Sequence, residues 1–317
     1  MIDLIVMPFS AAAFIYLIIS IALLFMGIEN VIFNIRGDKR ESVFSPFKRF
    51  IGGKMLPVKK RPPRSLYLSC LFLIAVYFFI PMGSLPQFIS AEGGFLIVVA
   101  LLVLAQNFYI RGLKQYSKRM YLSIDRNLIN VLFKFTMALL LVLITLAWFV
   151  INIGVPGSIF SLSTYAAMPL SSVTNVWGHL GMAFFFFSLA VVSPCRKVRD
   201  IGLTEYTSLL EVYDAVRSTL CPAIITAIFI PMNIGLTLKL AGVPMYAADF
   251  AFFWFKVLVV QTAVIPPIRA AYLNMKKRLP HGWKSSPYLF LSYSGVVLFL
   301  INLYLEAEKS LCWGSRS

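Results

Sequence analysis

Long apolar runs alternate with short charged segments along the whole chain. Eight of these runs are about as long as an apolar helix must be to cross the hydrocarbon core of a bilayer. They are residues 4–28, 66–90, 94–112, 131–153, 177–193, 219–240, 249–267 and 286–305. The pattern predicts an all-α, polytopic membrane protein with about eight transmembrane helices in a single transmembrane domain over residues 1–317.

The charges between the runs predict which side of the membrane each connection faces. Lysine and arginine are concentrated in four segments, whereas the alternate connections carry almost no charge. The basic segments are 30–65, 111–134, 195–217 and 269–284. Because basic loops tend to remain in the cytoplasm, these four segments should be cytoplasmic and both termini should lie outside.

Composition agrees with a membrane protein and narrows the classes of function. The 317 residues are 59% hydrophobic and only 13% charged, with a net charge of +16. In a soluble protein such a charge would favour nucleic acid, but this chain has no soluble basic domain for that role, so we expect no nucleic-acid partner. The apolar run 4–28 is too long for a cleaved signal peptide and is expected to remain as the first span.

Cysteine and histidine provide no recognisable ligand set for a metal or cluster. The six residues are Cys70, Cys195, Cys221, Cys312, His179 and His281. They lie far apart, and no two cysteines have the spacing of a zinc or iron–sulfur motif. The sequence therefore predicts no metal site, no cofactor and no catalytic residue.

Carboxylates gather in only one of the cytoplasmic segments, residues 194–217. They are Asp200, Glu205, Glu211 and Asp214. On a helix that begins near Thr204, Glu211 and Asp214 would share one face, and Arg217 would follow one turn later. These acids are either solvated loop residues in weak surface ion pairs or members of a path for protons or ions. The sequence leaves both interpretations open.

Lys256 lies in the middle of the apolar run 249–267, with Gln261 about one turn further along. A charge at that depth is costly in hydrocarbon, and a side chain cannot reach the headgroups easily from there. We therefore expect Lys256 to have a functional role, with Gln261 beside it in a polar path.

Two other ionisable residues lie at the edges of predicted spans. Lys134 is at the entrance of the fourth span, where its side chain can reach the headgroups. Glu29 ends the first span and is either a boundary residue or part of an internal acidic path. Pro81 and Pro231 should interrupt the hydrogen bonding of their helices, which membrane proteins tolerate beside polar cavities and in ordinary packing.

The basic segment 30–65 contains a predicted amphipathic helix over residues 43–59. Its apolar residues recur at helical spacing, with lysines and arginines between them, which is typical of a helix that lies on a membrane surface. The segment either binds lipid headgroups or docks a partner protein.

Short elements in a fixed order over about residues 20–290 carry a family resemblance. The run from Gly202 to Thr207 is similar to G-x-T-E-Y-S/T-G, and Gly27-Ile28-Glu29 is similar to G-x-E-R. Pro267-Ile268-Arg269, followed by Gly282-Trp283-Lys284, resembles P-R-x-R with G-W-K. Lys256 lies where the same family has a lysine in its seventh span. The family comprises the membrane protein of respiratory complex I that is called subunit 1 in mitochondria, together with its relatives in energy-converting nickel–iron hydrogenases.

The chain departs from that family at several acids of its glutamate path. About six residues are missing between Pro194 and Thr204, where the family has E-A-E-x-E-L, and its S-Y-E falls on Phe133-Lys134-Phe135. The chain is therefore more similar to the hydrogenase branch, such as the multisubunit energy-converting hydrogenases of methanogens, than to a quinone-reducing complex.

The resemblance implies a non-catalytic subunit in the cell membrane of a prokaryote. Its partners would be the large and small subunits of a soluble [NiFe]-hydrogenase, other membrane subunits including antiporter-like ones, and the lipid bilayer. It would couple ferredoxin-linked hydrogen turnover to the movement of protons or sodium. The alternative is a stand-alone secondary transporter, although the two halves of the chain show none of the internal similarity typical of that class.

The resemblance also implies roles for particular residues. The implied ion path comprises Glu29, Glu205, Glu211, Asp214, Lys256 and Lys134. The implied docking face for the soluble partner comprises Lys48, Arg49, Lys59, Lys60, Arg61, Arg269 and Lys284.

Overall fold

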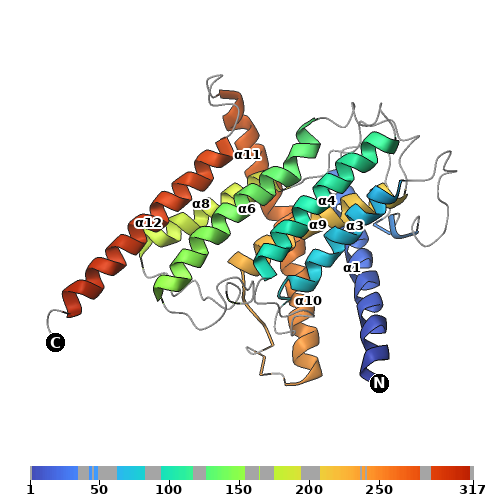
Figure 1. The fold of residues 1–317 in the computed structure, drawn as a ribbon, viewed down its shortest axis with the longest axis horizontal. Helices are drawn as coiled ribbons and strands as arrows, with labels where there is room; N and C mark the ends of the chain where they lie inside the picture. Colours follow the sequence, from blue (N-terminus) through green and yellow to red (C-terminus); the bar gives the residue numbers. More distant parts are fainter. Residues whose placement is uncertain are drawn as a thin grey trace. The chain divides into compact units, whose positions relative to one another are not determined.

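A computed structural model describes residues 2–34, 43–44, 46–48, 63–82, 94–116, 126–153, 164, 175–193, 208–235, 238–239, 241–278 and 287–314. Within these ranges every regular element is helical (Figure 1), as the sequence predicted. The α-helices are α1 (Ile2–Asn34), α3 (Arg64–Val76), α4 (Gly94–Tyr116), α6 (Arg126–Ile153), α8 (Val176–Val192), α9 (Ser208–Phe229), α10 (Val243–Val259), α11 (Ile265–Arg278) and α12 (Pro287–Gly314). A 3-10 turn, η1 (Tyr77–Phe79), follows α3, and a π-helix, η5 (Val260–Val264), joins α10 to α11.

Among the described residues, five helices are long and apolar enough to cross a membrane. The candidate spans are Ser10–Ile32, Gly94–Gln115, Leu209–Phe229, Val243–Met275 and Tyr288–Leu305, and shorter apolar helices cover Arg64–Phe79, Leu132–Trp148 and Val176–Val192. The chain is therefore a multi-pass helical membrane protein, which confirms the general prediction from the apolar runs.

The helix that corresponds to the sixth predicted span, α9, begins earlier than the apolar pattern predicted. α9 starts at Ser208, whereas the predicted span covered residues 219–240. Charged side chains lower the hydropathy of its first turns, but an acidic residue such as Glu211 favours the N-terminal turn of a helix. The segment 194–217, predicted as a cytoplasmic loop, is consequently helical from Ser208 onward.

The same helix also ends earlier, at Phe229. Pro231 lies two residues beyond that end, and it has no backbone N–H with which to continue the helical hydrogen bonding. Residues 230–235 follow as a non-helical segment, which we call the strap. The next helix, α10, begins at Val243 after Gly242, which has a positive φ of 66°.

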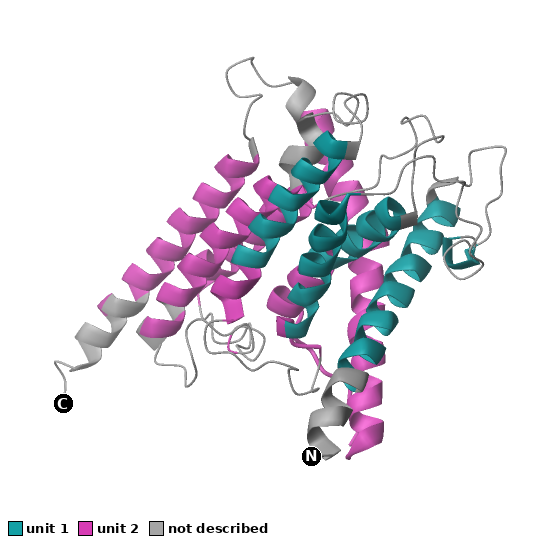
Figure 2. Ribbon diagram, turned by 45° about the vertical axis from the view of Figure 1, so that its right-hand side comes forward, with its two compact units in different colours: residues 1–78, 100–130, 194–221 teal, residues 79–99, 131–193, 222–317 magenta. Residues whose placement is uncertain are grey.

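The chain divides into two compact units (Figure 2). Unit 1 contains residues 1–78, 100–130 and 194–221, and unit 2 contains residues 79–99, 131–193 and 222–317. α9 contributes to both, because the boundary lies between Cys221 and Pro222.

In unit 1, α3 packs against the part of α4 that belongs to this unit. The Ser69 hydroxyl of α3 donates a hydrogen bond of 2.6 Å to the carbonyl of Ala105 in α4. The rings of Phe72 and Phe108 lie 5.5 Å apart between centroids. A hydroxyl that bonds a backbone carbonyl across two helices is a common way to join helices where no water is present.

In unit 2, α8 and α12 lie side by side and pack closely (Figure 1). Gly181 and Gly295 face each other, because a Cβ atom on Gly181 would lie 3.2 Å from the carbonyl oxygen of Gly295. The hydroxyls of Ser188 and Ser292 hydrogen bond across the same pair of helices. Small residues allow two membrane helices to approach closely, so that dispersion contacts and hydrogen bonds hold them together.

Candidate functional site

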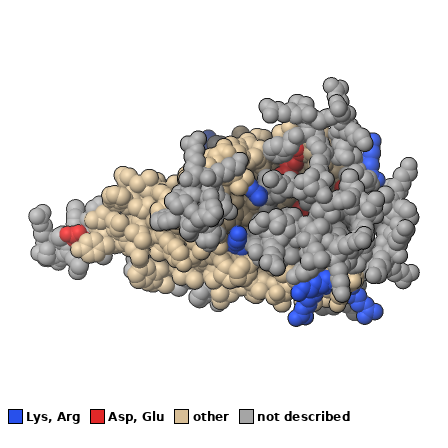
Figure 3. All heavy atoms as spheres, turned by 90° about the horizontal axis from the view of Figure 1, so that it is seen from above, with Lys and Arg blue, Asp and Glu red and all other residues tan. Residues whose placement is uncertain are grey.

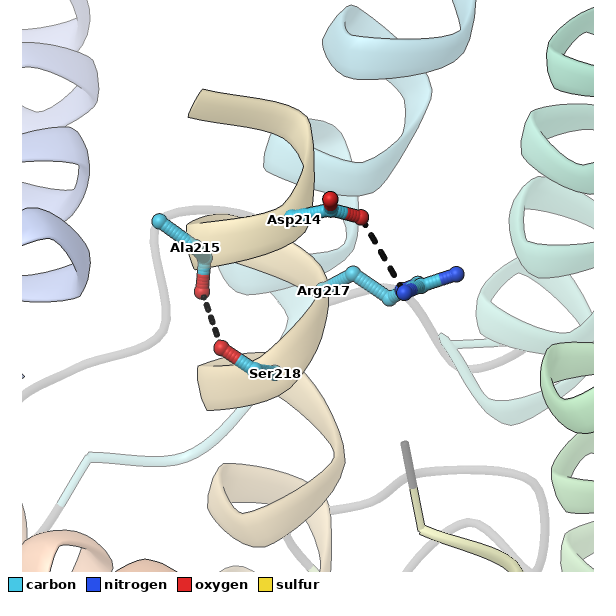
Figure 4. Close-up of polar contacts among 4 residues, drawn as sticks. All are labelled: Asp214, Ala215, Arg217 and Ser218. Carbon is cyan, nitrogen blue, oxygen red and sulfur yellow. Dashed lines mark hydrogen bonds and ion pairs between the residues drawn. The ribbon is translucent and has the colours of Figure 1, made fainter. Parts of the chain in front are cut away.

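The first group of buried charges lies on α9 in unit 1 (Figure 4). Arg217 Nη2 is 3.0 Å from Asp214 Oδ1, and the two side chains are 5% and 7% exposed. Both project from one face of the helix because they are three residues apart. Side chains from residue 212 to residue 229 are buried, so this part of α9 is surrounded by protein. Asp214 and Arg217 therefore do not form the solvated surface pair that the sequence had left open.

Aromatic rings and hydroxyls surround that ion pair. The ring of Tyr213 stacks on the ring of Tyr109 from α4, with centroids 4.2 Å apart and planes 5° from parallel. The Arg217 guanidinium lies 5.7 Å from the centroid of Tyr213, within the range of a cation–π interaction. Tyr77 donates a 3.1 Å hydrogen bond to the carbonyl of Val216. These contacts fix the helical turn that carries the charges.

Backbone carbonyls within α9 also accept side-chain hydrogen bonds. The hydroxyls of Ser218 and Thr219 donate to the carbonyl of Ala215, at 3.0 Å and 2.9 Å (Figure 4 shows the first of these). Hydroxyls satisfied by their own helix need no partner in the apolar surroundings. The hydroxyls of Ser218 and Thr219 beside the ion pair are therefore satisfied by their own helix.

The structure also describes three other residues of the predicted ion path. Glu211 is half-buried in the first turn of α9, three residues before Asp214. Glu29 is buried near the end of α1, with 5% of its surface exposed. Lys134 is half-buried on α6, and its ammonium lies 5.8 Å from the ring centroid of Tyr288 in unit 2. Glu205 lies outside the described residues.

The second group of buried charges lies in unit 2, where α10 meets the strap. Lys256 donates hydrogen bonds of 2.7 Å and 2.6 Å from Nζ to the carbonyls of Ile230 and Met232. Its Nζ also lies 5.1 Å from the ring centroid of Phe252. The ammonium therefore binds two backbone carbonyls just beyond the end of α9, and charge-assisted hydrogen bonds of this kind contribute about 1.5–3 kcal/mol each.

Asp249 holds the other end of the strap. Its Oδ1 accepts a 2.6 Å hydrogen bond from the backbone N–H of Gly235. Asp249 and Lys256 are seven residues apart on α10 and share one face, roughly 10 Å apart along the helix axis. The two side chains therefore bind different parts of the strap, Lys256 at Ile230 and Met232 and Asp249 at Gly235. The absence of a Cβ matters at Gly235, because one there would lie 3.0 Å from both carboxylate oxygens.

Gln261 follows on the π-helix η5. It is 3% exposed, and neither its amide nitrogen nor its amide oxygen has a hydrogen-bond partner in the described part of the chain. π-helices are rare and often occur at functional sites. Lys256 and Gln261 were predicted to act together, but five residues of regular α-helix rotate two side chains by about 140°. No hydrogen bond links the two within the described ranges, and Lys256 faces the strap.

The predicted docking residues are only partly described. Lys48 is exposed. Arg269 on α11 instead donates a 3.1 Å hydrogen bond from Nη1 to the carbonyl of Ser193 at the end of α8, so it stabilises the fold of unit 2. Outside the described residues lie Arg49, Lys59, Lys60, Arg61, Lys284 and most of the predicted surface helix 43–59, of which the structure describes residues 43–44 and 46–48. On the face drawn in Figure 3, described lysines and arginines (blue) form small separate patches, and aspartates or glutamates (red) are also visible.

Asp249 and the strap were missed in the sequence. The apolar pattern predicts a span that begins at Asp249, but α10 begins six residues earlier, at Val243. The available signal was its spacing of seven residues from Lys256, which places both on one helical face.

The described residues contain no group of three or more histidine, cysteine, aspartate or glutamate side chains that could hold a metal ion. Cys70 and Cys221 are separate, buried thiols. A scan against protein-family models finds no match for the chain, and a search of curated proteins finds no relative.

Proposed function

We propose that the chain is a membrane anchor and ion-translocation coupling subunit of an energy-converting nickel–iron hydrogenase. The observation that carries the proposal is the presence of charged side chains inside apolar helices, above all Lys256 against the strap and the Asp214–Arg217 pair. Ionisable groups are costly inside a membrane protein and commonly mark the path of an ion or a proton.

The resemblance described above connects these charges to a hydrogenase. In this proposal Glu29, Glu211, Asp214 and Lys256 belong to the ion path, and Glu205 remains a predicted member of it. The chain has eight spans, with both termini outside, and lies in the cell membrane of a prokaryote. The basic segments 30–65 and 269–284 face the cytoplasm, where they bind the soluble hydrogenase subunits.

The proposal is tested in inverted membrane vesicles that contain the assembled complex. We expect Lys256→Gln to abolish the effect of an uncoupler on ferredoxin-linked hydrogen turnover, because the variant removes a charge from the path. Dye-linked hydrogen oxidation, which bypasses coupling, should remain within about twofold of wild type.

Two variants control for unspecific damage. Lys256→Arg keeps the charge and should retain part of the uncoupler response. Lys239→Gln changes an exposed lysine of unit 2 and should behave as wild type. If Lys256→Gln assembles and keeps the full uncoupler response, Lys256 is not part of the path. If no hydrogenase subunit copurifies with the wild-type chain, the proposed complex is wrong.

The strap supports a second candidate, a stand-alone secondary transporter. Transporters bind ions at interrupted helices, where unwound backbone carbonyls become available. The end of α9 before Pro231 and the binding of two carbonyls beyond that end by Lys256 are similar to this arrangement. Ion uptake by proteoliposomes that contain the purified chain alone would favour the transporter, since the subunit of a hydrogenase requires its partners.

A further inference from the structure

Contacts between polar side chains connect α6, α11 and α12 within unit 2. Lys134 on α6 places its ammonium 5.8 Å from the ring centroid of Tyr288, the second residue of α12. The phenol of Tyr272 on α11 hydrogen bonds to the backbone of Tyr288. Arg269 lies one turn before Tyr272 on α11 and donates its hydrogen bond to the carbonyl of Ser193. We call Lys134, Arg269, Tyr272 and Tyr288 the cationic patch.

The cationic patch lies near the ends of apolar helices. Lys134 is the third residue of its apolar helix, and Tyr288 is the first residue of its candidate span. Tyr272 and Arg269 lie three and six residues before the end of theirs, no more than about 9 Å along a helix axis. Tyrosine and basic residues at such positions are typical of the boundary between the apolar layer and the headgroups. The patch therefore lies at the depth where lipid phosphates occur.

The two cations of the patch are half-buried and have only neutral partners in the described part of the chain. The ammonium of Lys134 contacts an aromatic ring, and the guanidinium of Arg269 contacts a backbone carbonyl. Neither forms an ion pair with a carboxylate of the described residues. The patch thus presents two positive charges and two phenols, a combination that favours an anion with hydrogen-bonding oxygens.

An exposed apolar face of α6 begins beside Lys134 and continues along the helix. Its residues are between 36% and 55% exposed, and their spacing of three, four or seven places them on one side of the helix. They are Phe133, Met137, Ile144, Trp148 and Ile151. Lys134 borders this face, three residues before Met137. A charged group followed by a long apolar surface matches the order of headgroup and acyl chain in a phospholipid.

We propose that the cationic patch binds the phosphate of an anionic phospholipid, whose acyl chain lies along the exposed face of α6. Lysine and arginine form charge-assisted hydrogen bonds with phosphate oxygens, and basic sites between membrane helices select anionic headgroups. A zwitterionic lipid is a poorer ligand, because its own cation would lie near Lys134 and Arg269. The inference goes beyond the proposed function, since such a lipid would stabilise unit 2 whether or not the chain belongs to a hydrogenase.

The experiment measures the Tm of the full chain in a non-ionic detergent at fixed pH and ionic strength. Phosphatidylglycerol, phosphatidylcholine or inorganic phosphate is added in separate titrations. We expect phosphatidylglycerol to raise the wild-type Tm until the effect saturates, because a ligand that binds only the folded state stabilises it. The other two compounds should have little effect. Lys134→Gln should raise the half-saturating concentration of phosphatidylglycerol roughly fivefold, the usual contribution of one basic residue beside anionic lipid.

Two variants serve as controls for this titration. Lys134→Arg keeps the charge and should respond to phosphatidylglycerol as the wild type does. Lys114→Gln removes an exposed lysine from α4, in a segment that is also predicted to be cytoplasmic, and should leave the response unchanged. If Lys114→Gln weakens the response as much as Lys134→Gln does, overall charge attracts the lipid and the proposed site is wrong.

Native mass spectrometry gives a second readout that needs no variant. From an equal mixture of the two lipids, the wild-type protein should retain phosphatidylglycerol in preference to phosphatidylcholine. Equal retention, or equal Tm shifts with the two lipids, would overturn the proposal. So would a Lys134→Gln variant with the wild-type half-saturating concentration. If inorganic phosphate alone produces the full shift, the ligand is a soluble anion and the assignment to a lipid is wrong.

Discussion

The ion pair between Asp214 and Arg217 shows how a buried charge depends on its partner. Both side chains are buried in α9, and their closest atoms are 3.0 Å apart. If one member is removed, the other charge is buried without its counter-charge, whereas removal of both members leaves no buried charge at this place. The pair thus restricts substitution at either position more strongly than its own contribution to stability would suggest.

A double-mutant cycle tests this point. We expect Arg217→Met to lower the free energy of unfolding by about 3–5 kcal/mol, since it leaves the carboxylate of Asp214 without its counter-charge. Asp214→Leu combined with Arg217→Met should lie closer to wild type than either single variant. Reversible unfolding in detergent measures the four free energies. Additive effects would contradict a direct interaction between the two side chains.

Residue types alone revealed some of the charged positions but not their contacts. Lys256 could be found from its depth in an apolar run. Its partners could not, because Ile230 and Met232 offer backbone carbonyls, which every residue has, and the sequence does not show that they lie beyond the end of a helix. Asp249 could not be recognised as a buried residue, because the apolar pattern predicts that its helix begins at residue 249, whereas α10 begins at Val243.

At the scale of helices, the close packing of α8 and α12 depends on two glycines. A Cβ on Gly295 would lie 2.7 Å from the ring of Phe185, and a Cβ on Gly181 would lie 2.7 Å from the ring of Phe299. The two rings themselves pack 5.7 Å apart between centroids, so neither has room to move away. A side chain at either glycine must therefore separate the helices or displace a ring.

Alanine substitution tests this packing. We expect Gly295→Ala to lower the free energy of unfolding by about 1–3 kcal/mol, the usual cost of an overpacked core. Gly94→Ala is the matched control, because its Cβ would meet only the ring of Phe79 at an ordinary 3.7 Å. That variant should stay within about 0.5 kcal/mol of wild type. If both substitutions lower the free energy of unfolding equally, the close contact of Gly295 with Phe185 is not the cause.

Helix positions followed the apolar pattern more closely than helix ends did. The predicted span 66–90 ends as a helix at Phe79, because Pro81 lacks the N–H that would continue the helical hydrogen bonding. The pattern placed the start of α9 too late, because Glu211, Asp214 and Arg217 lower the hydropathy of turns that are nonetheless helical. The spacing of apolar residues along the chain does not predict which helices contact each other. The bond from Ser69 to Ala105 joins residues from separate apolar runs, and nothing in either run specifies the other as its neighbour.

At the scale of the whole molecule, charge asymmetry predicts the orientation in the membrane. Basic segments alternate with nearly uncharged ones along the sequence, so both termini and the uncharged segment 154–176 should face outward. Reporter fusions that are active only on one side of the membrane can check this at three places, after residue 317, before residue 1 and within 154–176. A cytoplasmic signal from any of the three would contradict the proposed orientation.

The strap also has a consequence for biosynthesis. The carbonyls of Ile230 and Met232 are bound by a residue that is made 26 and 24 positions later. At a synthesis rate of about 5–20 residues per second, the ribosome needs roughly 1–5 s to produce that stretch of chain. Until Lys256 has followed it out of the ribosome, the end of α9 lacks its lysine, and a bilayer offers no water in its place. We therefore expect α9 and α10 to complete their insertion as a pair, with the second helix supplying the ammonium that stabilises the end of the first one in lipid.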